Sequence, residues 1–536
     1  MTIHRLRAPS TDGALLADPP LSEADSRLAR NVDRLAHWEH DLQGRSAGRL
    51  RDLVRRQMVE KSRAYMGHFG LDFPDVADPA SPLVVTGHQP ELFHPGVWVK
   101  NFAVAAIART VGGVGLNLIV DNDIPKSSSL RVPSLDGGGL RVRRLDYDEW
   151  AGEVPFEDLR VRDEGRFASF GDRARRALEG LVADPVIDDF WPRAVARRGG
   201  TDRIGLRFAA ARRELEASWG ARNLEVPLSA VCETEGFLWF ASHILAQLPH
   251  FQRVHNDALA RYRAVYGIRS RNHPVPALGR RGDWREAPFW VWREAIPRRR
   301  PLMIRQLPHS MEIRIGGEDA PLMEIPLAPD REACCAVERL MGLPALGVRL
   351  RPRALTTTMF ARLMLGDLFL HGIGGAKYDE LGDEVVRGFF RVEPPGFLTL
   401  SMTSWLDLGL DPASPERLGV VDRLLRDLAF NPDRHLEGDL TPDIRGWVEA
   451  KRSAIAGPVE TRGQRLARFA AIRRSNEALQ PLVREHHEHL LAERARLFTG
   501  LRRNALARNR EYSLVLHSSR RLRDAMAGAT VGVARS

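Results

Sequence analysis

Residues 82–123 read PLVVTGHQPELFHPGVWVKNFAVAAIARTVGGVGLNLIVDND, and the fold class can be inferred from them. A short apolar run at 82–86 ends at Gly87, and the apolar segment 97–110 is suited to a helix. A second apolar run at 114–120 then ends at Asp121. Two such strands joined by a helix are typical of a parallel, doubly wound sheet with a right-handed crossover. We therefore predict an α/β fold with a parallel sheet built around these residues.

The same alternation recurs further along the chain. LEVPLSAVCE (224–233) predicts a strand, TEGFLWFASHILAQL (234–248) a helix, and GDLFLHG (366–372) a strand followed by a helix from Tyr378. Residues 254–330 are rich in Arg, Pro and Trp and follow no clear period, so we expect an irregular inserted segment there.

Four domains or segments are expected from these patterns. Residues 1–80 should form an N-terminal helical segment, and residues 81–410 the α/β core with its insert. Residues 411–511 carry apolar positions at a spacing of three to four. This spacing predicts a long helix, kinked near Pro481, that packs against 415–428 as an antiparallel coiled coil. Residues 512–536 should form a closing strand and a tail.

The composition is that of an ordinary globular protein. Its 536 residues are 43% apolar and 28% charged, with a net charge of +10, which excludes a disordered or collagen-like chain. No window approaches the ~20 apolar residues that span a bilayer, and no signal peptide is evident, so we expect a cytoplasmic protein with no membrane partner. The modest positive charge permits nucleic-acid binding without requiring it. Three cysteines cannot build a disulfide framework.

The strongest signal for chemistry is the loop TGHQPELFHPG, which follows the first strand. In open α/β sheets, ligands bind beyond the carboxyl ends of the strands, where helix N-termini attract anions. Gly87 and Gly96 allow close approach of the backbone, and Lys100 lies about one turn into the helix. His88 and His94 can exchange protons near neutral pH. We expect an anion site here; the alternative is a simple turn with surface or capping histidines.

The second strand ends in the loop DNDIPKSSS. Its residues Asp121 and Asp123, beside Lys126, could bind an amine or a metal-bound nucleotide, or act in acid–base catalysis. The alternative is an Asx-rich turn with an ion-paired lysine.

A third loop, HGIGGAKYDE, begins at His371 and places three glycines just before Lys377. Successive backbone N–H groups in such a loop form a nest that binds phosphate or carboxylate. The alternative is a plain connector. If both glycine-containing loops serve one anion, Lys100 and Lys377 should lie at the same cavity.

The candidate site comprises residues of these three loops and their flanks. The candidate catalytic residues are His88, His94, Lys100, Asp121 and Asp123. The candidate residues for binding substrate or phosphate are Thr86, Gly87, Gln89, Gly96, Asn101, Lys126, His371, Gly372, Gly374, Gly375 and Lys377. No metal site is predicted, because the cluster HHEH (486–489) lacks the i, i+4 spacing of a helical zinc motif.

These motifs resemble those of the BshC family, the cysteine ligases of bacillithiol biosynthesis. TGHQPELFHPG is similar to that family's Thr-Gly-Gln-Gln…Gly-Leu-Phe loop, which precedes a helix with a lysine, and HGIGGAKYDE is similar to its Gly-Gly-Pro-Gly-Glu loop. The order of core, coiled coil and closing Tyr-Ser-Leu-Val-Leu-His segment is also similar. The positions that match by this resemblance are Gly87, His88, Gln89, Phe93, Lys100 with a small offset, Gly374 and Gly375.

Three departures from the family pattern affect the expected pocket. His88 replaces the first glutamine of the family loop, and His94-Pro95 replaces its Thr-Gly. The family's Glu-Asp-His-Asp segment is represented only by residues 121–123. The substrate could therefore differ while the scaffold is kept.

The resemblance implies a Rossmann-like core with inserted segments and an α-helical coiled coil that could pair two chains. It implies a ligase or transferase that joins an amino acid or amine to a small anionic metabolite; the family reaction adds cysteine to glucosaminyl malate. ATP or ADP with Mg²⁺ is a candidate cofactor.

In this hypothesis the backbone of both glycine-containing loops holds phosphate or carboxylate, and Lys100 and Lys377 neutralise developing charge. A histidine of the first loop acts as acid or base, and Asp121 or Asp123 orients an amine or Mg²⁺. The alternative function is a non-catalytic coiled-coil scaffold or a nucleic-acid-binding protein, which would bind with a steep salt dependence.

Overall fold

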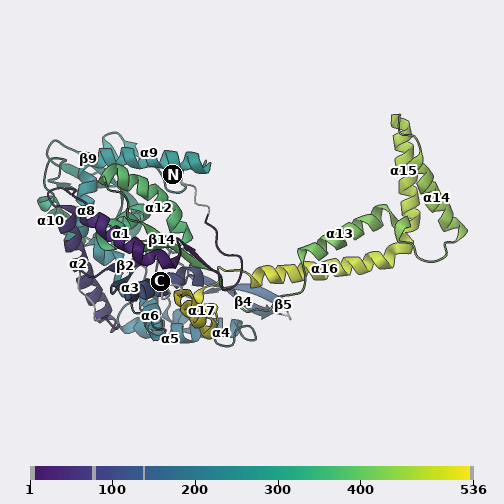
Figure 1. Ribbon diagram of the computed structural model, residues 1–536, viewed down its shortest axis with the longest axis horizontal. Helices are drawn as coiled ribbons and strands as arrows, with labels where there is room; N and C mark the ends of the chain where they lie inside the picture. Colours follow the sequence, from purple (N-terminus) through teal and green to yellow (C-terminus); the bar gives the residue numbers. More distant parts are fainter. Residues whose placement is uncertain (1–5, 75–79, 137–138, 532–536) are drawn as a thin grey trace. The chain divides into compact units, whose positions relative to one another are not determined.

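The computed structural model describes residues 6–74, 80–136 and 139–531, and the chain divides into two compact units. The first unit comprises Met1–Leu406 and Arg510–Ser536, and the second comprises Asp407–Asn509 (Figure 1). The helices of the first unit are α1 (Ala24–Ala36), α2 (Ala47–His68), α3 (Pro95–Thr110), α4 (Glu164–Ala177), α5 (Ile187–Ala196), α6 (Ile204–Ser218), α7 (Leu228–Cys232), α8 (Glu235–Ala246), α9 (Leu248–Tyr266), α10 (Cys334–Met341), α11 (Ala354–Phe360), α12 (Ile373–Val385) and α17 (Ser519–Val531).

The main sheet of the first unit has six strands in the order β1-β14-β13-β2-β3-β6. Their bounds are β1 (Leu15–Asp18), β14 (Phe397–Met402), β13 (Leu368–His371), β2 (Leu83–His88), β3 (Val114–Ile119) and β6 (Leu224–Pro227). The five strands from β14 to β6 are parallel to their neighbours, and β1 pairs antiparallel with β14. The α/β class predicted from the sequence is confirmed, and the sheet is mixed rather than wholly parallel.

The strand order explains where a ligand can enter the sheet. From β2 the chain passes through α3 to β3 on one side, whereas from β13 it passes through α12 to β14 on the other side. The loops that leave the adjacent strands β2 and β13 therefore diverge. Such a switch point opens a crevice beyond the carboxyl ends of the two strands.

The N-terminal segment was expected to be helical and contains α1 and α2, but the strand β1 was not expected. Leu15 pairs with Met402 and Asp18 with Thr399, so β1 extends the main sheet at its edge. A four-residue strand is too short for its alternation to be recognised in the sequence.

The expected irregular insert at 254–330 is an ordered substructure, which is a second correction. The helix α9 continues to Tyr266, and the following residues build an antiparallel sheet in the order β11-β10-β9-β8-β12, with β7 paired to β8. The bounds are β7 (Arg280–Arg281), β8 (Trp284–Arg293), β9 (Ile296–Gln306), β10 (Met311–Ile315), β11 (Met323–Ile325) and β12 (Val348–Pro352). Register shifts between β8 and β9 interrupt the alternation that would have identified these strands.

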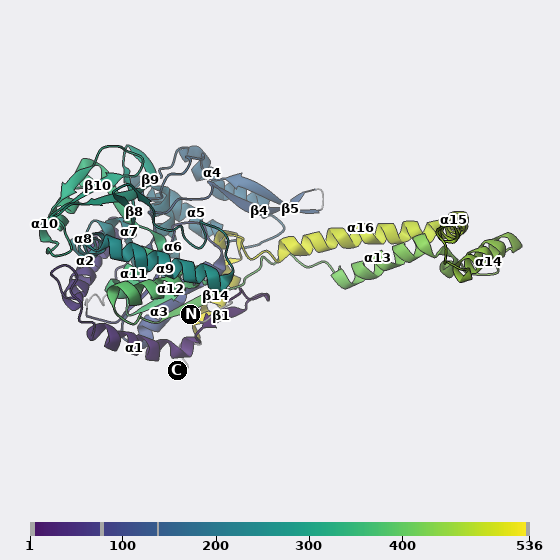
Figure 2. The ribbon, with the colours of Figure 1, turned by 90° about the horizontal axis from the view of Figure 1, so that it is seen from above.

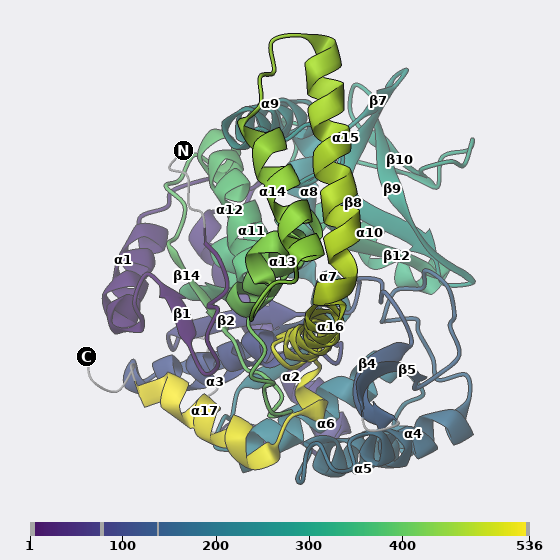
Figure 3. The same cartoon turned by 90° about the vertical axis from the view of Figure 1, so that its right-hand side faces the viewer.

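A small hairpin of β4 (Ser129–Asp136) and β5 (Gly139–Asp146) follows the end of β3 along the chain. It packs beside α4, which Figure 3 shows next to α5. Val132 is fully buried in this contact, whereas the arginines of β5 are exposed.

The C-terminal segment from Tyr512 to His517 forms no strand, contrary to the prediction. Residues Leu514–Leu516 form a 3-10 turn, η8, and the chain then continues into α17, which packs on α3. The amide of Leu514 donates to the carbonyl of Phe93 at 2.8 Å. A short buried run has no period that separates a strand from such a turn.

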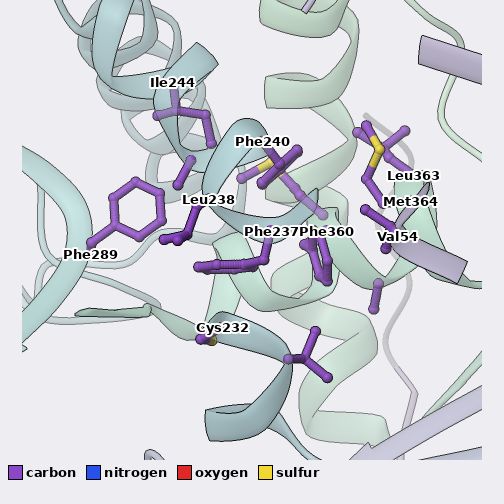
Figure 4. Packing of buried hydrophobic residues seen from close by; sticks show 14 of the residues in the cluster. Val54, Cys232, Phe237, Leu238, Phe240, Ile244, Phe289, Phe360, Leu363 and Met364 are labelled. Atoms are coloured by element: carbon purple, nitrogen blue, oxygen red, sulfur yellow. The ribbon is translucent and has the colours of Figure 1, made fainter. Parts of the chain in front are cut away.

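An aromatic cluster holds the elements of the core together (Figure 4). The ring of Phe360 in α11 lies edge-on to Phe237 and Phe240 of α8, with centroids 5.1 and 5.3 Å apart. Phe289 of the second sheet lies 6.5 Å from Phe237. The second sheet therefore shares its hydrophobic core with α8 and α11.

The second unit is a helical hairpin, and Figure 2 shows α13 beside α16 and α14 beside α15. Its helices are α13 (Pro415–Phe430), α14 (Pro442–Ala456), α15 (Arg462–Leu479) and α16 (Arg484–Ala507), with the 3-10 turn η7 (Gln480–Val483) between the last two. Arg417 pairs with Glu493 at 2.7 Å, and Gln480 donates to the carbonyl of Ala429 at 3.1 Å, so α13 and α16 run antiparallel. The expected interruption at Pro481 coincides with η7.

None of the helices in the described ranges combines the length and the apolar character that crossing a membrane demands.

Candidate functional site

A cavity of about 900 Å³, called the sheet-edge cavity below, lies beyond the carboxyl ends of β2 and β13. Its wall includes the β2–α3 loop, the β13–α12 loop and residues of the second sheet. Lys100 and Lys377, which are far apart in the sequence, both line it. The two glycine-containing loops therefore meet at one cavity, as the strand order requires.

Most of the candidate residues line this cavity. Those on its wall are Gly87, His88, Gln89, His94, Gly96, Lys100, Asp123, His371, Gly372, Gly374, Gly375 and Lys377. Those away from it are Thr86, Asn101, Asp121 and Lys126.

Asp121 lies away from the wall of the cavity and makes structural contacts. Its carboxylate is buried and accepts hydrogen bonds from the Ser229 amide at 2.9 Å and from the Ser229 hydroxyl at 2.5 Å. These contacts fix the start of α7 beside β3. Burial raises the pKa of Asp121, although the two Ser229 hydrogen bonds oppose that rise.

Thr86, Asn101 and Lys126 also lie outside the site, for three different reasons. The Thr86 hydroxyl donates to the carbonyl of Leu370 at 2.9 Å and so joins β2 to β13. The Asn101 amide donates to the buried Glu216 at 2.7 Å behind α3. Lys126 is exposed. Sequence position alone could not show on which side of the strand or helix these side chains lie.

Lys100 is the most unusual charged group of the cavity. Its side chain is 3% exposed, and its ammonium donates to the Gly87 carbonyl at 3.4 Å. Across the residues that the structure describes, no carboxylate lies within ion-pair distance of it. Burial lowers the pKa of Lys100 to about 8. A buried ammonium without a counter-charge is costly, which indicates a site for an anion.

The start of α12 adds a second anion-binding element to the same cavity. Gly372 is the N-cap residue, and no side chain caps this helix end. The first N–H groups of a helix have no partner within the helix. A Cβ at Gly372 or Gly374 would meet nothing within 4 Å, so open space adjoins this backbone. Lys377 lies one turn further on and is exposed at the cavity.

His371 anchors this helix start to the sheet. Its Nε2 lies 2.6 Å from an Asp379 carboxylate oxygen, and both side chains are buried. Asp379 also accepts from the Thr358 hydroxyl at 2.6 Å and from Arg362 at 2.8 Å. Burial by itself would raise the pKa of Asp379, but His371 and Arg362 outweigh burial and lower it. The ionised Asp379 thus ties β13, α11 and α12 together.

His88 and His94 differ in their protonation chemistry. Burial, assisted by the nearby Lys100, lowers the pKa of His88 to about 3, which is far from the value near 7 that suits proton transfer at neutral pH. His94 caps α3, since its Nδ1 accepts from the Gly96 amide at 3.1 Å. Its Nε2 lies 3.7 Å from Glu511. Burial lowers the pKa of His94, and Glu511 partly restores it. His94 is therefore the better proton-transfer group.

The opposite wall of the cavity is built by residues of the second sheet. Asp123 accepts from Gln89 at 2.8 Å and from Arg299 at 2.9 Å. The guanidinium groups of Arg299 and Arg353 lie 5.2 and 4.1 Å from the centroid of the Trp290 ring. This wall can hold a planar or negatively charged part of a ligand.

Several residues of the cavity were not expected from the sequence. Trp290 and Arg299 belong to the segment interpreted as an irregular insert, and Arg510 and Glu511 directly follow the helical unit. Arg510 donates to the Ser401 hydroxyl at 2.9 Å and to the Met402 carbonyl at 3.0 Å. These four residues belong to no local sequence motif. They reach the cavity only when the chain is folded.

The candidate residues form no magnesium site. Asp121 is bound to Ser229 and Asp123 to Arg299, so the two carboxylates do not offer ligands to a common ion. Within the ranges 6–74, 80–136 and 139–531, no group of three His, Cys, Asp or Glu side chains could hold a metal ion. We therefore derive no step that involves Mg²⁺.

Gly96 is expected to be intolerant of substitution. A Cβ at this position would lie 2.3 Å from the Met402 carbonyl oxygen. We predict that Gly96→Ala lowers the free energy of unfolding by about 1–3 kcal/mol, because the backbone must shift. The matched variant Gly374→Ala meets open space, and it should be neutral or stabilising by up to ~1 kcal/mol. Urea unfolding of both variants checks this; equal stabilities would contradict the close contact between α3 and β14.

No family model matches the chain, and a search of curated proteins finds no match either. The function is accordingly inferred from the geometry of the sheet-edge cavity.

Proposed function

We propose that the chain is a BshC-like ligase or transferase, which binds a small anionic metabolite in the sheet-edge cavity and joins an amino acid or amine to it. The observation that carries this proposal is the presence of Lys100 and the uncapped start of α12 on the wall of one cavity. Both are positive in character, and neither is neutralised by a described side chain. A phosphate or carboxylate of the substrate would supply the missing charge.

The architecture supports this proposal. Five parallel strands with a switch point between β2 and β13 are consistent with a Rossmann-like core. The two loops that resemble the BshC motifs are the loops that leave β2 and β13. The coiled-coil prediction of the same resemblance has its counterpart in the antiparallel pair α13 and α16.

The proposed chemistry gives a role to several groups on the wall of the cavity. Lys100, Lys377 and the first N–H groups of α12 hold the anionic group and stabilise charge that develops on a leaving group. His94 accepts a proton from the attacking amine at Nε2, where Glu511 would stabilise the resulting imidazolium, because Nδ1 already accepts the Gly96 amide hydrogen. In the proposed reaction Asp123, whose carboxylate accepts hydrogen bonds from Gln89 and Arg299, would orient the ammonium group of the incoming amine.

The test is product formation from cysteine and glucosaminyl malate, assayed by mass spectrometry with and without ATP. We expect a product of the combined mass less one water. Its rate should fall about 10- to 100-fold in Lys100→Met, the loss expected for one contact to a charged group, and should be unchanged in Lys126→Met. The proposal would be refuted if no product formed with cysteine or with any other amine tested. Equal rates in wild type and Lys100→Met would also refute it.

A second role is favoured by the surface of the helical unit. Phe430, Leu466, Phe469 and Phe498 are each at least 60% exposed. Aromatic residues such as the three phenylalanines are enriched in protein–protein interfaces. We propose that α13 to α16 pair two copies of the chain.

This pairing leads to a prediction about oligomeric state. Light scattering should give the molar mass of a dimer for wild type. The double variant Phe469→Glu with Phe498→Glu should be a monomer with unchanged helix content. The matched change Leu135→Glu, on the hairpin of the first unit, should leave the dimer intact. A wild-type monomer, or a dimer that survives the double change, would contradict the pairing.

A further inference from the structure

Two adjacent cysteines form an exposed dithiol that the sheet-edge cavity does not use. Cys334 and Cys335 are the first residues of α10, and both are exposed. Their sulfur atoms lie 3.7 Å apart. The remaining cysteine, Cys232, is buried in the core.

The dithiol is mounted on a rigid support. The side-chain amide of Gln43 donates to the carbonyls of Ala328 at 3.2 Å and Arg331 at 2.8 Å. The backbone carbonyl of Gln43 accepts from the Ala333 amide at 3.0 Å. On the opposite face of α10, the buried residues Ala336, Val337 and Leu340 join the main hydrophobic core. The backbone that carries the two cysteines is therefore held in place, while their side chains stay exposed.

The geometry favours capture of one atom by both sulfurs over formation of a disulfide. Cα atoms of adjacent residues are about 3.8 Å apart, below the usual range of about 4.4–6.8 Å for a disulfide, so this bond would be strained and easily reduced. Bonds from sulfur to a soft metal are about 2.3 Å, so two sulfurs at this separation can share one atom. Hydrogen bonding with Cys334 raises the pKa of the Cys335 thiol.

The surroundings limit which ligand fits. Of the described residues, no third His, Cys, Asp or Glu completes a metal site around the pair. Zinc, which takes four ligands, is therefore disfavoured. An acceptor with only two exchangeable positions matches a dithiol of this kind.

We propose that Cys334 and Cys335 form a binding site for monosubstituted trivalent arsenic compounds. In the binding step, two As–S bonds form and two As–O bonds of the hydrated arsenical R–As(OH)₂ break. The two thiol protons leave with the hydroxides as two molecules of water. No oxidant is needed, because arsenic and sulfur keep their oxidation states. This site is independent of the proposed ligase or transferase activity.

The experiment uses the full-length reduced chain and phenylarsine oxide. We expect one equivalent to bind, to remove both exposed thiols from reaction with a thiol reagent, and to add one phenylarsenic group less two hydrogens to the intact mass. A small dithiol should reverse the binding. Because chelation raises affinity by about 10²–10⁴, Cys334→Ser and Cys335→Ser should each weaken it at least ~100-fold.

The buried cysteine supplies the matched control. Cys232→Ala should retain one-to-one binding with the affinity of wild type. The proposal is overturned if either serine variant binds as tightly as wild type, if wild type takes up two equivalents, or if Zn²⁺ alone forms a tight one-to-one complex at these cysteines. Circular dichroism of each variant ensures that lost binding does not reflect unfolding.

Discussion

Replacing Lys100 with methionine is expected to weaken anion binding about 10- to 100-fold and, at the same time, to stabilise the ligand-free protein. The two effects have one cause, since the buried ammonium has no described carboxylate beside it. Burial lowers the Lys100 pKa from 10.5 to about 8, which corresponds to a penalty of about 3 kcal/mol at neutral pH. Methionine fills a similar volume without the charge. Titration calorimetry with inorganic pyrophosphate and urea unfolding measure the two quantities.

The pH dependence of this effect has a definite sign. Below pH 8 the lysine is protonated in both the folded and the unfolded chain, so the full penalty applies. Between pH 8 and 10.5 the folded state loses its proton first, and the penalty disappears. The stability advantage of Lys100→Met should therefore shrink across this window. Lys126→Met is the control, because Lys126 is exposed and should show neither effect. A less stable Lys100→Met protein that still binds the anion would contradict the assignment.

The largest loss of stability is expected for Asp379→Asn. This change keeps the shape of the side chain but removes the charge that faces Arg362 and His371. Breaking a buried ion pair typically costs about 3–5 kcal/mol, and we expect a loss in this range. The pairing also fixes the start of α12, so anion binding should weaken in parallel. Urea unfolding and the pyrophosphate titration again supply the measurements.

Asp383→Asn is the matched control for this prediction. Asp383 lies on the same helix and pairs with the same Arg362 at 2.8 Å, but its side chain is 24% exposed, compared with 1% for Asp379. Burial raises the pKa of Asp383 to about 6, so the ionised form of this carboxyl gives the folded state no net stabilisation. The loss of unfolding free energy in Asp383→Asn should stay below ~1 kcal/mol. Since the Asp379 pKa is lowered, its contribution should begin to decline as the pH falls below about 4 and should be lost only as the pH falls through the lowered folded-state pKa. Similar losses of unfolding free energy in Asp379→Asn and Asp383→Asn would contradict the stabilising role of the Asp379 carboxylate.

The sequence was most informative where local pattern and tertiary structure agree. The elements β2, α3 and β3 were predictable because buried parallel strands are continuous apolar runs that end in glycine or aspartate. The meeting of the loops after β2 and β13 followed from the same pattern, since parallel strands present their carboxyl ends at one edge. The start of α12 differs from the prediction: a helix was expected from Tyr378, whereas α12 begins at Ile373 and contains Gly374 and Gly375 in its first turn.

The remaining features depend on contacts that a single sequence does not display. Asp121 and Asn101 resemble site residues in the sequence, yet Ser229 and Glu216 hold them in the interior. The second sheet was missed because a register shift disrupts the alternation of β8. Arg510 reaches the cavity only because the chain returns to the first unit after residue 509.

The central claim is that Lys100 and the start of α12 bind one anion together. A crystal structure of the full chain with inorganic pyrophosphate tests it most directly. We predict that one phosphate group lies within about 3.2 Å of Lys100 Nζ and of a backbone nitrogen among residues 373–375. A pyrophosphate bound away from both groups, with Lys100 still donating only to the Gly87 carbonyl, would contradict the claim.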